Sequence, residues 1–281
     1  MTDACAVYNS AKWIEENQAD FAPPICNKCM FSDQLKVFFV GGPNSRKDYH
    51  LEEGEEVFYQ IQGDMVLKVI EQGLPKDIHI KQGEIFLLPS RIEHSPQRFA
   101  NTIGCVIERT RRENEFDCLR YFVDGTTEVL WERFFHLEDV VKDLPPYIKQ
   151  FHASEEFKSG KPGSGTRVEP HKYEVDSRKL DSPIPLDEFV NQHLVEINSA
   201  PYKLYGSPQY TTEVLLYGNG KHRISTNDVE LIVMPQRGKV SIEVDGKRET
   251  LQAFHIGRIL PGKNVLLDVD EGGICITVRM A

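Results

Sequence analysis

The sequence of 281 residues lacks a long hydrophobic run, an N-terminal signal and an excess of positive charge. Since a transmembrane helix needs about 18 or more apolar residues, no membrane span is expected. The N-terminus, MTDACAVYNSAKW, has no basic segment followed by an apolar one, so the predicted location is the cytosol. Lys and Arg total 33 against 43 Asp and Glu, a formal net charge of −10, which disfavours nucleic acid and anionic membranes as partners.

Cysteine is sparse, with six residues spread over the whole chain and one C-x-x-C pair, Cys26 and Cys29. Nothing indicates secretion, so free thiols are expected rather than disulfides. A structural zinc or rubredoxin-type iron site needs four ligands, usually from two such pairs. The lone pair is therefore interpreted as two ordinary thiols, with a metal half-site as the alternative.

The composition is otherwise that of a folded protein. Hydrophobic residues make up 40% and charged residues 27%, close to the averages of globular domains, which excludes a mostly disordered or fibrous chain. A length of 281 residues allows one large domain or two modest ones.

Short β-branched and aromatic runs, separated by glycine, dominate two parts of the chain and predict antiparallel strands. The first group occupies 35–40, 57–61, 65–70, 78–80, 84–89, 104–109 and 119–123, and the second 212–218, 229–234, 239–244, 258–261, 264–269 and 274–280. Helices are predicted at 10–19, with Ser10 as N-cap and a stop at 21–24, and at 127–143, 148–157 and 186–197, with Pro145 and Pro146 as a break.

The two groups of strands resemble each other, which indicates an internal repeat. GDMVLKV near residue 63 is similar to GKVSIEV near 238, and GEIFLLPSRIEH near 83 is similar to IGRILPGKNVL near 256. We therefore expect a mainly β protein of two similar barrels with a few flanking helices. The predicted domains are 1–160 and 182–281, joined by a linker at 161–181 that is rich in Gly, Pro, Ser and charge.

Three residues of the first half have the chemistry of a metal site. His50, Glu56 and His94 lie next to predicted strands, and two imidazoles with one carboxylate can bind one face of a metal ion while leaving the other face open. Such a triad suits Fe(II) that binds O₂ and a chelating substrate. Each residue also has a plain interpretation, since a lone His at a strand end is usually solvated and Glu56 belongs to an acidic run.

The joint spacing of these residues resembles the two motifs of the cupin superfamily, a double-stranded β-helix or jelly-roll fold. The first motif reads G-x5-D-x-H-x5-E-x6-G from Gly42 to Gly63, and the second reads G-x5-P-x4-H from Gly83 to His94. Two positions depart from the general pattern: Asp48 replaces the first His of H-x-H, and Arg91 replaces a Gly. These departures favour a three-ligand site over the four-ligand site of 3-His-1-Glu cupins.

The resemblance narrows to the animal-type 3-hydroxyanthranilate 3,4-dioxygenase family. It is carried by PPICNK at 23–28, by the block at 35–69 and by QGEIFLLPSRIEHSPQRFANTIG at 82–104, and it is dense over about 13–160. The resemblance implies one Fe(II) per chain on His50, Glu56 and His94. It also implies ring cleavage of 3-hydroxyanthranilate by O₂ to 2-amino-3-carboxymuconate semialdehyde, in the kynurenine route of tryptophan catabolism to quinolinate and NAD.

The same resemblance implies roles for further residues. It places substrate contacts on Arg98 and Glu108, places Arg46 beside O₂ and the substrate as a catalytic residue, and has Glu56 touch the substrate as well as the metal. Asn27 is a further candidate for lining the pocket. A guanidinium suits the substrate carboxylate because its planar fork binds carboxylates with two parallel hydrogen bonds.

The second half is expected to be a degenerate barrel without a metal. Aligning RILPGKNVL with FLLPSRIEH sets Leu266 opposite His94, although His222 and Asp228 repeat the spacing of His50 and Glu56. Two barrels in one chain would replace the subunit contact of single-barrel cupin dimers, so a monomer is expected.

Two other functions remain open from the sequence, because a fold does not fix a function. One is a non-catalytic binding or storage cupin, and the other is an isomerase or epimerase that uses Zn²⁺ as a Lewis acid. Oxygen uptake with substrate distinguishes the dioxygenase from both, and the identity of the metal distinguishes it from the isomerase.

Overall fold

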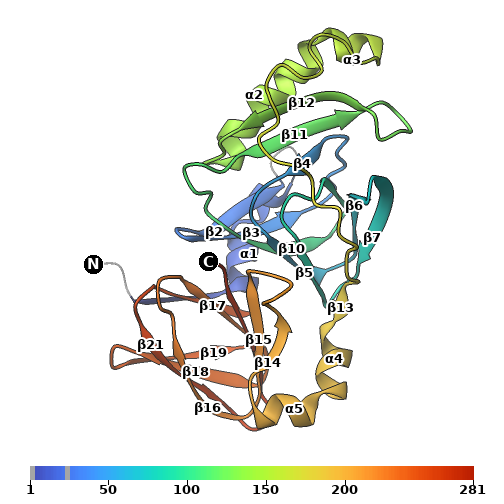
Figure 1. Cartoon of the computed structure of the whole chain (residues 1–281). Helices are drawn as coiled ribbons and strands as arrows, with labels where there is room; N and C mark the ends of the chain where they lie inside the picture. Colours follow the sequence, from blue (N-terminus) through green and yellow to red (C-terminus); the bar gives the residue numbers. More distant parts are fainter. Residues whose placement is uncertain (1–3, 23–25) are drawn as a thin grey trace. The chain divides into compact units, whose positions relative to one another are not determined.

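The computed structural model describes residues 4–22 and 26–281 (Figure 1). Antiparallel strands form four sheets, and the chain divides into two compact units. The N-terminal barrel comprises residues 20–22, 26–28 and 38–185, and the C-terminal barrel comprises 4–19, 29–37 and 186–281. Residues 23–25, which include part of the predicted helix stop and of the PPICNK segment, lie outside the described residues.

The N-terminal barrel is built from two six-stranded sheets and two helices. One sheet has the order β13-β8-β5-β10-β3-β2, and the other has the order β12-β11-β4-β9-β6-β7. β2 (Asn27–Ser32) and β3 (Leu35–Gly41) each contribute residues to both units. The remaining elements are β4 (Tyr49–Leu51), β5 (Glu56–Gln62), β6 (Met65–Glu71), β7 (Leu74–Ile80), β8 (Glu84–Leu88), β9 (His94–Arg98), β10 (Ile103–Arg109), β11 (Asp117–Phe122), β12 (Val129–Phe135), α2 (Val140–Ala153), α3 (Glu155–Ser159) and β13 (Ile184–Pro185).

Alternation along each strand sorts the side chains of this barrel into an inner and an outer set. On β6 the fully buried Met65, Leu67 and Val69 recur at every second position and pack into one apolar cluster. Phe58 of β5 and Phe86 of β8, which are register partners, join the same cluster. Val106 of β10 also belongs to this cluster, while His50 of β4, His94 of β9 and Glu108 of β10 line a cavity beside it.

The C-terminal barrel has a six-stranded sheet, β1-β20-β17-β22-β15-β14, and a four-stranded sheet, β16-β21-β18-β19. Its elements are β1 (Cys5–Asn9), α1 (Ser10–Glu16), α4 (Leu186–Gln192), α5 (Leu194–Ser199), β14 (Tyr202–Tyr205), β15 (Glu213–Tyr217), β16 (Gly220–Ser225), β17 (Leu231–Arg237), β18 (Lys239–Val244), β19 (Lys247–Gln252), β20 (His255–Ile259), β21 (Asn264–Val269) and β22 (Ile274–Arg279). The short 3-10 helix η1 (Gln18–Phe21) follows α1.

Aliphatic side chains fill the interior of the C-terminal barrel. Val240, Ile242 and Val244 alternate along β18 and meet Val265, Leu267 and Val269 of β21 in one buried cluster. This clean alternation is the pattern that the sequence showed at 239–244.

The mainly β class and the predicted strands of both groups are confirmed. The helix predicted at 127–143 is wrong, because β12 occupies Val129–Phe135 and pairs with β11. Both faces of β12 are largely buried, so its residues do not alternate between apolar and polar, and Leu130, Phe134 and Leu137 happened to fit a helical spacing.

The break predicted at Pro145 and Pro146 is also wrong, since α2 runs through both residues. Two prolines remove only two backbone donors, and the helix packs its buried Leu144 and Phe151 against Trp131 and Tyr121 in one apolar cluster. That packing outweighs the lost hydrogen bonds. At the first helix, Asn9 rather than Ser10 is the N-cap, since its side chain accepts a hydrogen bond from the backbone N–H of Lys12 at 3.0 Å. The helix predicted at 186–197 is divided into α4 and α5.

The segment 161–181 contains no helix or strand. Hydrogen bonds from its side chains and its backbone attach it to the N-terminal barrel. Arg167 donates from Nε to Glu132 at 2.7 Å, and the backbone N–H of Leu180 donates to Glu71 at 2.7 Å. The predicted domain limits of 1–160 and 182–281 differ from those of the two compact units described above. In those units, residues 4–19 and 29–37 group with the C-terminal barrel.

All six cysteines are free thiols, as predicted. Cys26 points its Sγ at the carbonyl of Pro43, and Cys29 points its own at the carbonyl of Phe31. Within the described residues, no helix combines the length and the apolar character that crossing a membrane requires.

One hairpin allows a matched test of the core. Leu67 on β6 is 0% exposed, and Leu74 on β7 of the same hairpin is 69% exposed. Leu67→Ala is expected to lower the free energy of unfolding by about 2–5 kcal/mol, because it leaves a cavity. Leu74→Ala should change it by less than about 0.5 kcal/mol. Urea denaturation of the full chain measures both, and equal losses would contradict the assignment of the inner face.

Candidate metal and substrate site

His50, Glu56 and His94 come together inside the N-terminal barrel, each from a different strand. His50 lies on β4 directly opposite His94 on β9, and Glu56 begins β5 in the other sheet. One ligand atom from each residue lies within 4.8 Å of the other two. The Nε2 atom of His94 is 2.9 Å from Oε1 of Glu56, and the two imidazole rings are 5.3 Å apart between centroids.

The second nitrogen of His94 and one nitrogen of His50 meet protein acceptors. Nδ1 of His94 lies 2.9 Å from the carbonyl oxygen of Ile92, and Nε2 of His50 lies 2.7 Å from Oδ2 of Asp117. Such contacts orient imidazole ligands and fix which nitrogen carries the proton. Burial acts to raise the pKa of the Glu56 carboxyl, but the adjacent His94 outweighs it, and the net shift of the pKa is downward. Glu56 is therefore a carboxylate at neutral pH.

The donor set fits a divalent transition metal. Oε1 of Glu56 is buried 2.9 Å from Nε2 of His94, and it has no hydrogen-bond donor when that nitrogen is deprotonated as a metal ligand. A buried carboxylate oxygen without a hydrogen bond is costly unless a cation occupies the space beside it. Two imidazoles and one carboxylate are the ligands that non-haem iron, zinc and related ions bind. The metal-binding character of the site rests on these contacts.

A cavity of about 120 Å³ opens onto the three ligand residues. Apolar side chains form much of its wall, among them Phe58, Pro96, Val106, Leu137 and Leu144. Its polar lining consists of Asn27, Asn44, Arg46, His50, Glu56, His94, Arg98 and Glu108. A second cavity of about 1000 Å³ shares Asn27, Asn44, Arg46, Val140 and Leu144 with the first, so the two cavities adjoin.

Arg98 is the charged residue of this cavity with the poorest set of partners. It follows His94 by four positions on β9, and the alternation of the strand directs both side chains inward. Its Nη1 donates to Oε1 of Gln60 at 3.3 Å, and its Nε is buried without a partner. Gly104 makes room for this guanidinium, because a Cβ at that position would collide with Nη1.

Burial lowers the pKa of Arg98 to about 10, which still leaves it protonated at neutral pH. In the part of the chain that the structure describes, no carboxylate forms an ion pair with it. A buried cation of this kind is stabilised by an anion that enters the cavity.

Arg46 and Asp48 explain one departure from the cupin pattern. Asp48 forms a close ion pair with Arg46 through Nη2 and accepts a second hydrogen bond from Nε at 3.1 Å. The residue that replaces the first His of the motif therefore binds Arg46 and not the three ligand residues. Arg46 lines both cavities, and so does Asn27.

Arg91 explains the other departure. Its backbone has a φ of 61°, in the left-handed region that glycine adopts most readily, as expected at a position where the general motif has Gly. Arg91 compensates through its side chain, which donates to Glu53 at 2.7 Å and lies over the ring of Tyr173.

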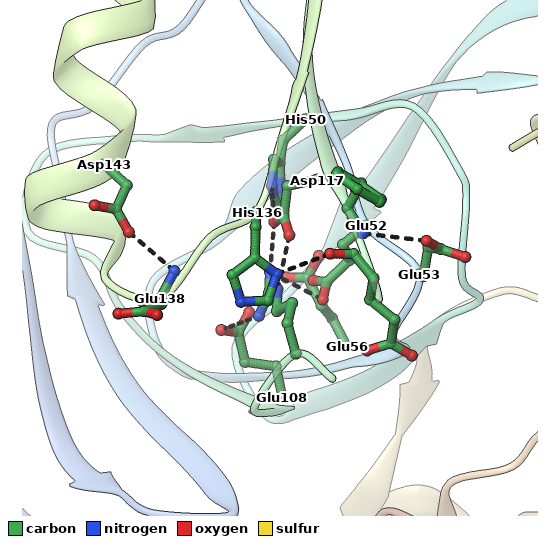
Figure 2. Close-up of polar contacts among 12 residues, drawn as sticks. His50, Glu52, Glu53, Glu56, Glu108, Asp117, His136, Glu138 and Asp143 are labelled. Carbon is green, nitrogen blue, oxygen red and sulfur yellow. Dashed lines mark hydrogen bonds and ion pairs between the residues drawn. The ribbon is translucent and has the colours of Figure 1, made fainter. Parts of the chain in front are cut away.

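Buried carboxylates surround the base of the site, as Figure 2 shows for Glu52, Glu56, Glu108 and Asp117 near His50. Glu108 is 5% exposed and forms an ion pair with Arg111 at 2.6 Å. The sequence did not identify Glu52, Arg111 or Asp117, because they belong to charged runs of the kind that usually face solvent. Alternation along β10 could have indicated that Val106 and Glu108 share the inner face.

The corresponding positions of the C-terminal barrel have different surroundings. His222 contacts the carbonyl oxygen of Gly218 at 2.9 Å, and Asp228 is exposed. Leu266, which the alignment set opposite His94, is partly exposed, while its neighbours Val265 and Leu267 fill the interior. The alignment is therefore displaced by one position relative to the inner face of β21.

Comparison with known proteins gives full-length relatives. Residues 1–152 match the 3-hydroxyanthranilic acid dioxygenase family. The 3-hydroxyanthranilate 3,4-dioxygenase of Caenorhabditis briggsae is 54% identical over 272 residues, which covers 96% of each chain. The enzyme of that name from Homo sapiens is 42% identical over 267 residues, covering 95% of this chain and 93% of the relative. Among solved structures, a cupin 2 conserved barrel domain protein from Leptotrichia buccalis has a TM-score of 0.50 at 9% identity, covering 98% of this chain and 96% of that one, which supports the cupin fold.

Metal binding provides a direct test of the three ligand residues. The metal-free full chain is expected to bind one Co²⁺ per chain. His94→Ala should weaken this binding by more than about 100-fold, beyond the 10- to 100-fold that loss of an outer partner costs. The matched control is His79→Ala, because His79 is exposed on β7 and should leave the affinity unchanged. Calorimetric titration measures both, and a stoichiometry of two or an unaffected His94→Ala would contradict the assignment.

Proposed function

This chain belongs to the 3-hydroxyanthranilic acid dioxygenase family, and from that premise we propose that it cleaves the aromatic ring of 3-hydroxyanthranilate with O₂. The product would be 2-amino-3-carboxymuconate semialdehyde, the precursor of quinolinate in NAD synthesis. The observation that carries the proposal is a buried Arg98, without a carboxylate partner among the described residues, in the same small cavity as His50 and His94.

The metal of the proposal is Fe(II), one ion per chain, held by His50, Glu56 and His94. Iron would supply the oxygen chemistry that redox-inert zinc lacks, because it exchanges electrons with O₂ and substrate. The three residues line the small cavity, and the rest of its volume is available to the substrate. Glu56 lines the cavity as well as belonging to the proposed ligand set, and this supports its contact with the substrate.

Arg98 would hold the carboxylate of the substrate. 3-Hydroxyanthranilate carries a carboxylate, an amine and a phenol on neighbouring ring carbons. A guanidinium binds a carboxylate through two parallel hydrogen bonds, and the buried Nε of Arg98 is one donor available for them. With the carboxylate fixed, the amine and phenol are directed toward Glu108 and the ligand residues.

Glu108 and the apolar wall of the small cavity complete the orientation of the substrate. The Glu108 carboxylate accepts hydrogen bonds from the amine or phenol, while Arg111 fixes its position from behind. Phe58, Pro96 and Val106 line the cavity and exclude water from the ring. Such orientation in a water-excluded cavity is the protein's share of the catalysis.

Arg46 and Asn27 are proposed at the entrance, because both line the small cavity and the larger one. Arg46 would lie beside O₂ and substrate, with Asp48 fixing its guanidinium. We further propose that the C-terminal barrel is degenerate and binds no metal, with 161–181 as the connection between the repeats, and that the enzyme is a cytosolic monomer.

Turnover is the direct test of the function. The Fe(II)-loaded full chain is expected to consume one O₂ for each 3-hydroxyanthranilate, measured with an oxygen electrode and by the absorbance of the product. Zn²⁺-loaded protein should consume none. Oxygen uptake that is absent with Fe(II), or turnover of another substrate without O₂, would favour the binding or isomerase function instead.

The role of Arg98 has a more specific test. Arg98→Gln should raise KM for 3-hydroxyanthranilate by roughly 10- to 150-fold, since a hydrogen bond to a charged group contributes about 1.5–3 kcal/mol. The variant should change KM much less for 2-aminophenol, which lacks the carboxylate. Steady-state kinetics with both compounds measures the difference. Equal losses for the two compounds would show that Arg98 does not recognise the carboxylate.

A further inference from the structure

Arg111 connects the residues around the site through a single buried guanidinium. It lies in the loop between β10 and β11, and its side chain is 2% exposed. Nε and Nη2 bind the two carboxylate oxygens of Asp117 at 3.0 and 2.8 Å. Nη1 binds Glu108 at 2.6 Å, and Nη2 also lies 2.9 Å from Glu52. Three carboxyl groups from different parts of the chain therefore share one cation.

Asp117 links Arg111 to His50, one of the three proposed metal ligands. It is 0% exposed, and its Oδ2 contacts both Nη2 of Arg111 and Nε2 of His50, the latter at 2.7 Å. Two parallel hydrogen bonds from the guanidinium fix the plane of this carboxylate. A carboxylate fixed in this way holds an imidazole ligand in one orientation and raises its basicity.

Glu108 links Arg111 to the small cavity in which the substrate is proposed to bind. Its carboxylate lines the small cavity, and the described residues show Arg111 as its ion-pair partner. Without that contact, a carboxylate that is 5% exposed would lose the cation that balances its burial.

We propose that Arg111 is a positioning residue that sets His50, through Asp117, and Glu108 at the same time. This inference rests on the proposed function, because it assigns the metal to His50 and the substrate to Glu108. Arg111 itself contacts neither the metal nor the substrate. Its fixed fork of donors spans two carboxylates at once, which the single ammonium of a lysine does not reproduce.

Arg111 acts through a metal branch, which consists of Asp117 and His50, and through a substrate branch, which consists of Glu108. Three substitutions in the full chain separate the two branches. Asp117→Asn should weaken Co²⁺ binding to the metal-free protein by about 10- to 100-fold and change KM at saturating Fe(II) by less than about twofold. Glu108→Gln should raise KM about tenfold and leave Co²⁺ affinity within about twofold. Arg111→Lys should change both quantities, because it disturbs both branches.

A matched control separates positioning from a general loss of stability. Arg258 is a buried arginine of the C-terminal barrel that also contacts two carboxylates, Asp33 and Glu230. Arg258→Lys is expected to lower the melting temperature without changing Co²⁺ affinity or KM. If Arg111→Lys does not fold, as judged by circular dichroism, the divergent effects of Asp117→Asn and Glu108→Gln carry the test.

The proposal would be overturned if Arg111→Lys lowered the melting temperature but left Co²⁺ affinity and KM within twofold of the unsubstituted chain. It would equally fail if Asp117→Asn and Glu108→Gln changed the same quantity. Co²⁺ affinity is measured without substrate, so an unsubstituted chain that binds Co²⁺ but does not turn over 3-hydroxyanthranilate would refute the proposed function and leave the metal branch of the inference testable.

Discussion

Burying ionised groups inside a β-barrel is costly, and the N-terminal barrel does so repeatedly. Glu56, Glu108 and Asp117 are buried, and so are Arg98 and Arg111. Unpaired charges would not persist there, because desolvation exceeds what a fold of marginal stability tolerates. The barrel satisfies most of these groups with one guanidinium and two imidazoles. Two groups with incomplete partners, Glu56 and Arg98, line the cavity.

Much of this arrangement follows from features that a sequence displays. Motif spacing predicted that His50, Glu56 and His94 lie near one another, and the four-residue interval from His94 to Arg98 matches the period of a strand. Arg111 and Asp117 could not be predicted in the same way. Their loop position has no periodicity, and the run of charges around them resembles a solvated turn. Only the tertiary structure shows that this turn folds inward.

The same limit explains the errors in secondary structure. Strands with one buried face, such as β18, alternate visibly and were predicted. β12 is buried on both faces and has no alternation, so its apolar residues could fit either period. Residues 29–37 group with the C-terminal barrel through contacts such as that of the Leu35 N–H with Glu230, and no local pattern reveals such a partner.

The pairing of β1 with β20 joins two strands that lie far apart in the sequence, Cys5–Asn9 and His255–Ile259, inside one barrel. Translation produces Cys5–Asn9 well before His255–Ile259, so β1 has no partner until β20 has been synthesised. The strands from β4 to β12 have no such delay, since their partners lie within a shorter stretch of sequence. Co-translational folding is thus expected to finish the metal-binding barrel first, while the early segment stays exposed to chaperones. A chain that stopped before His255 would lack β20, β21 and β22, and β1 would have no partner strand.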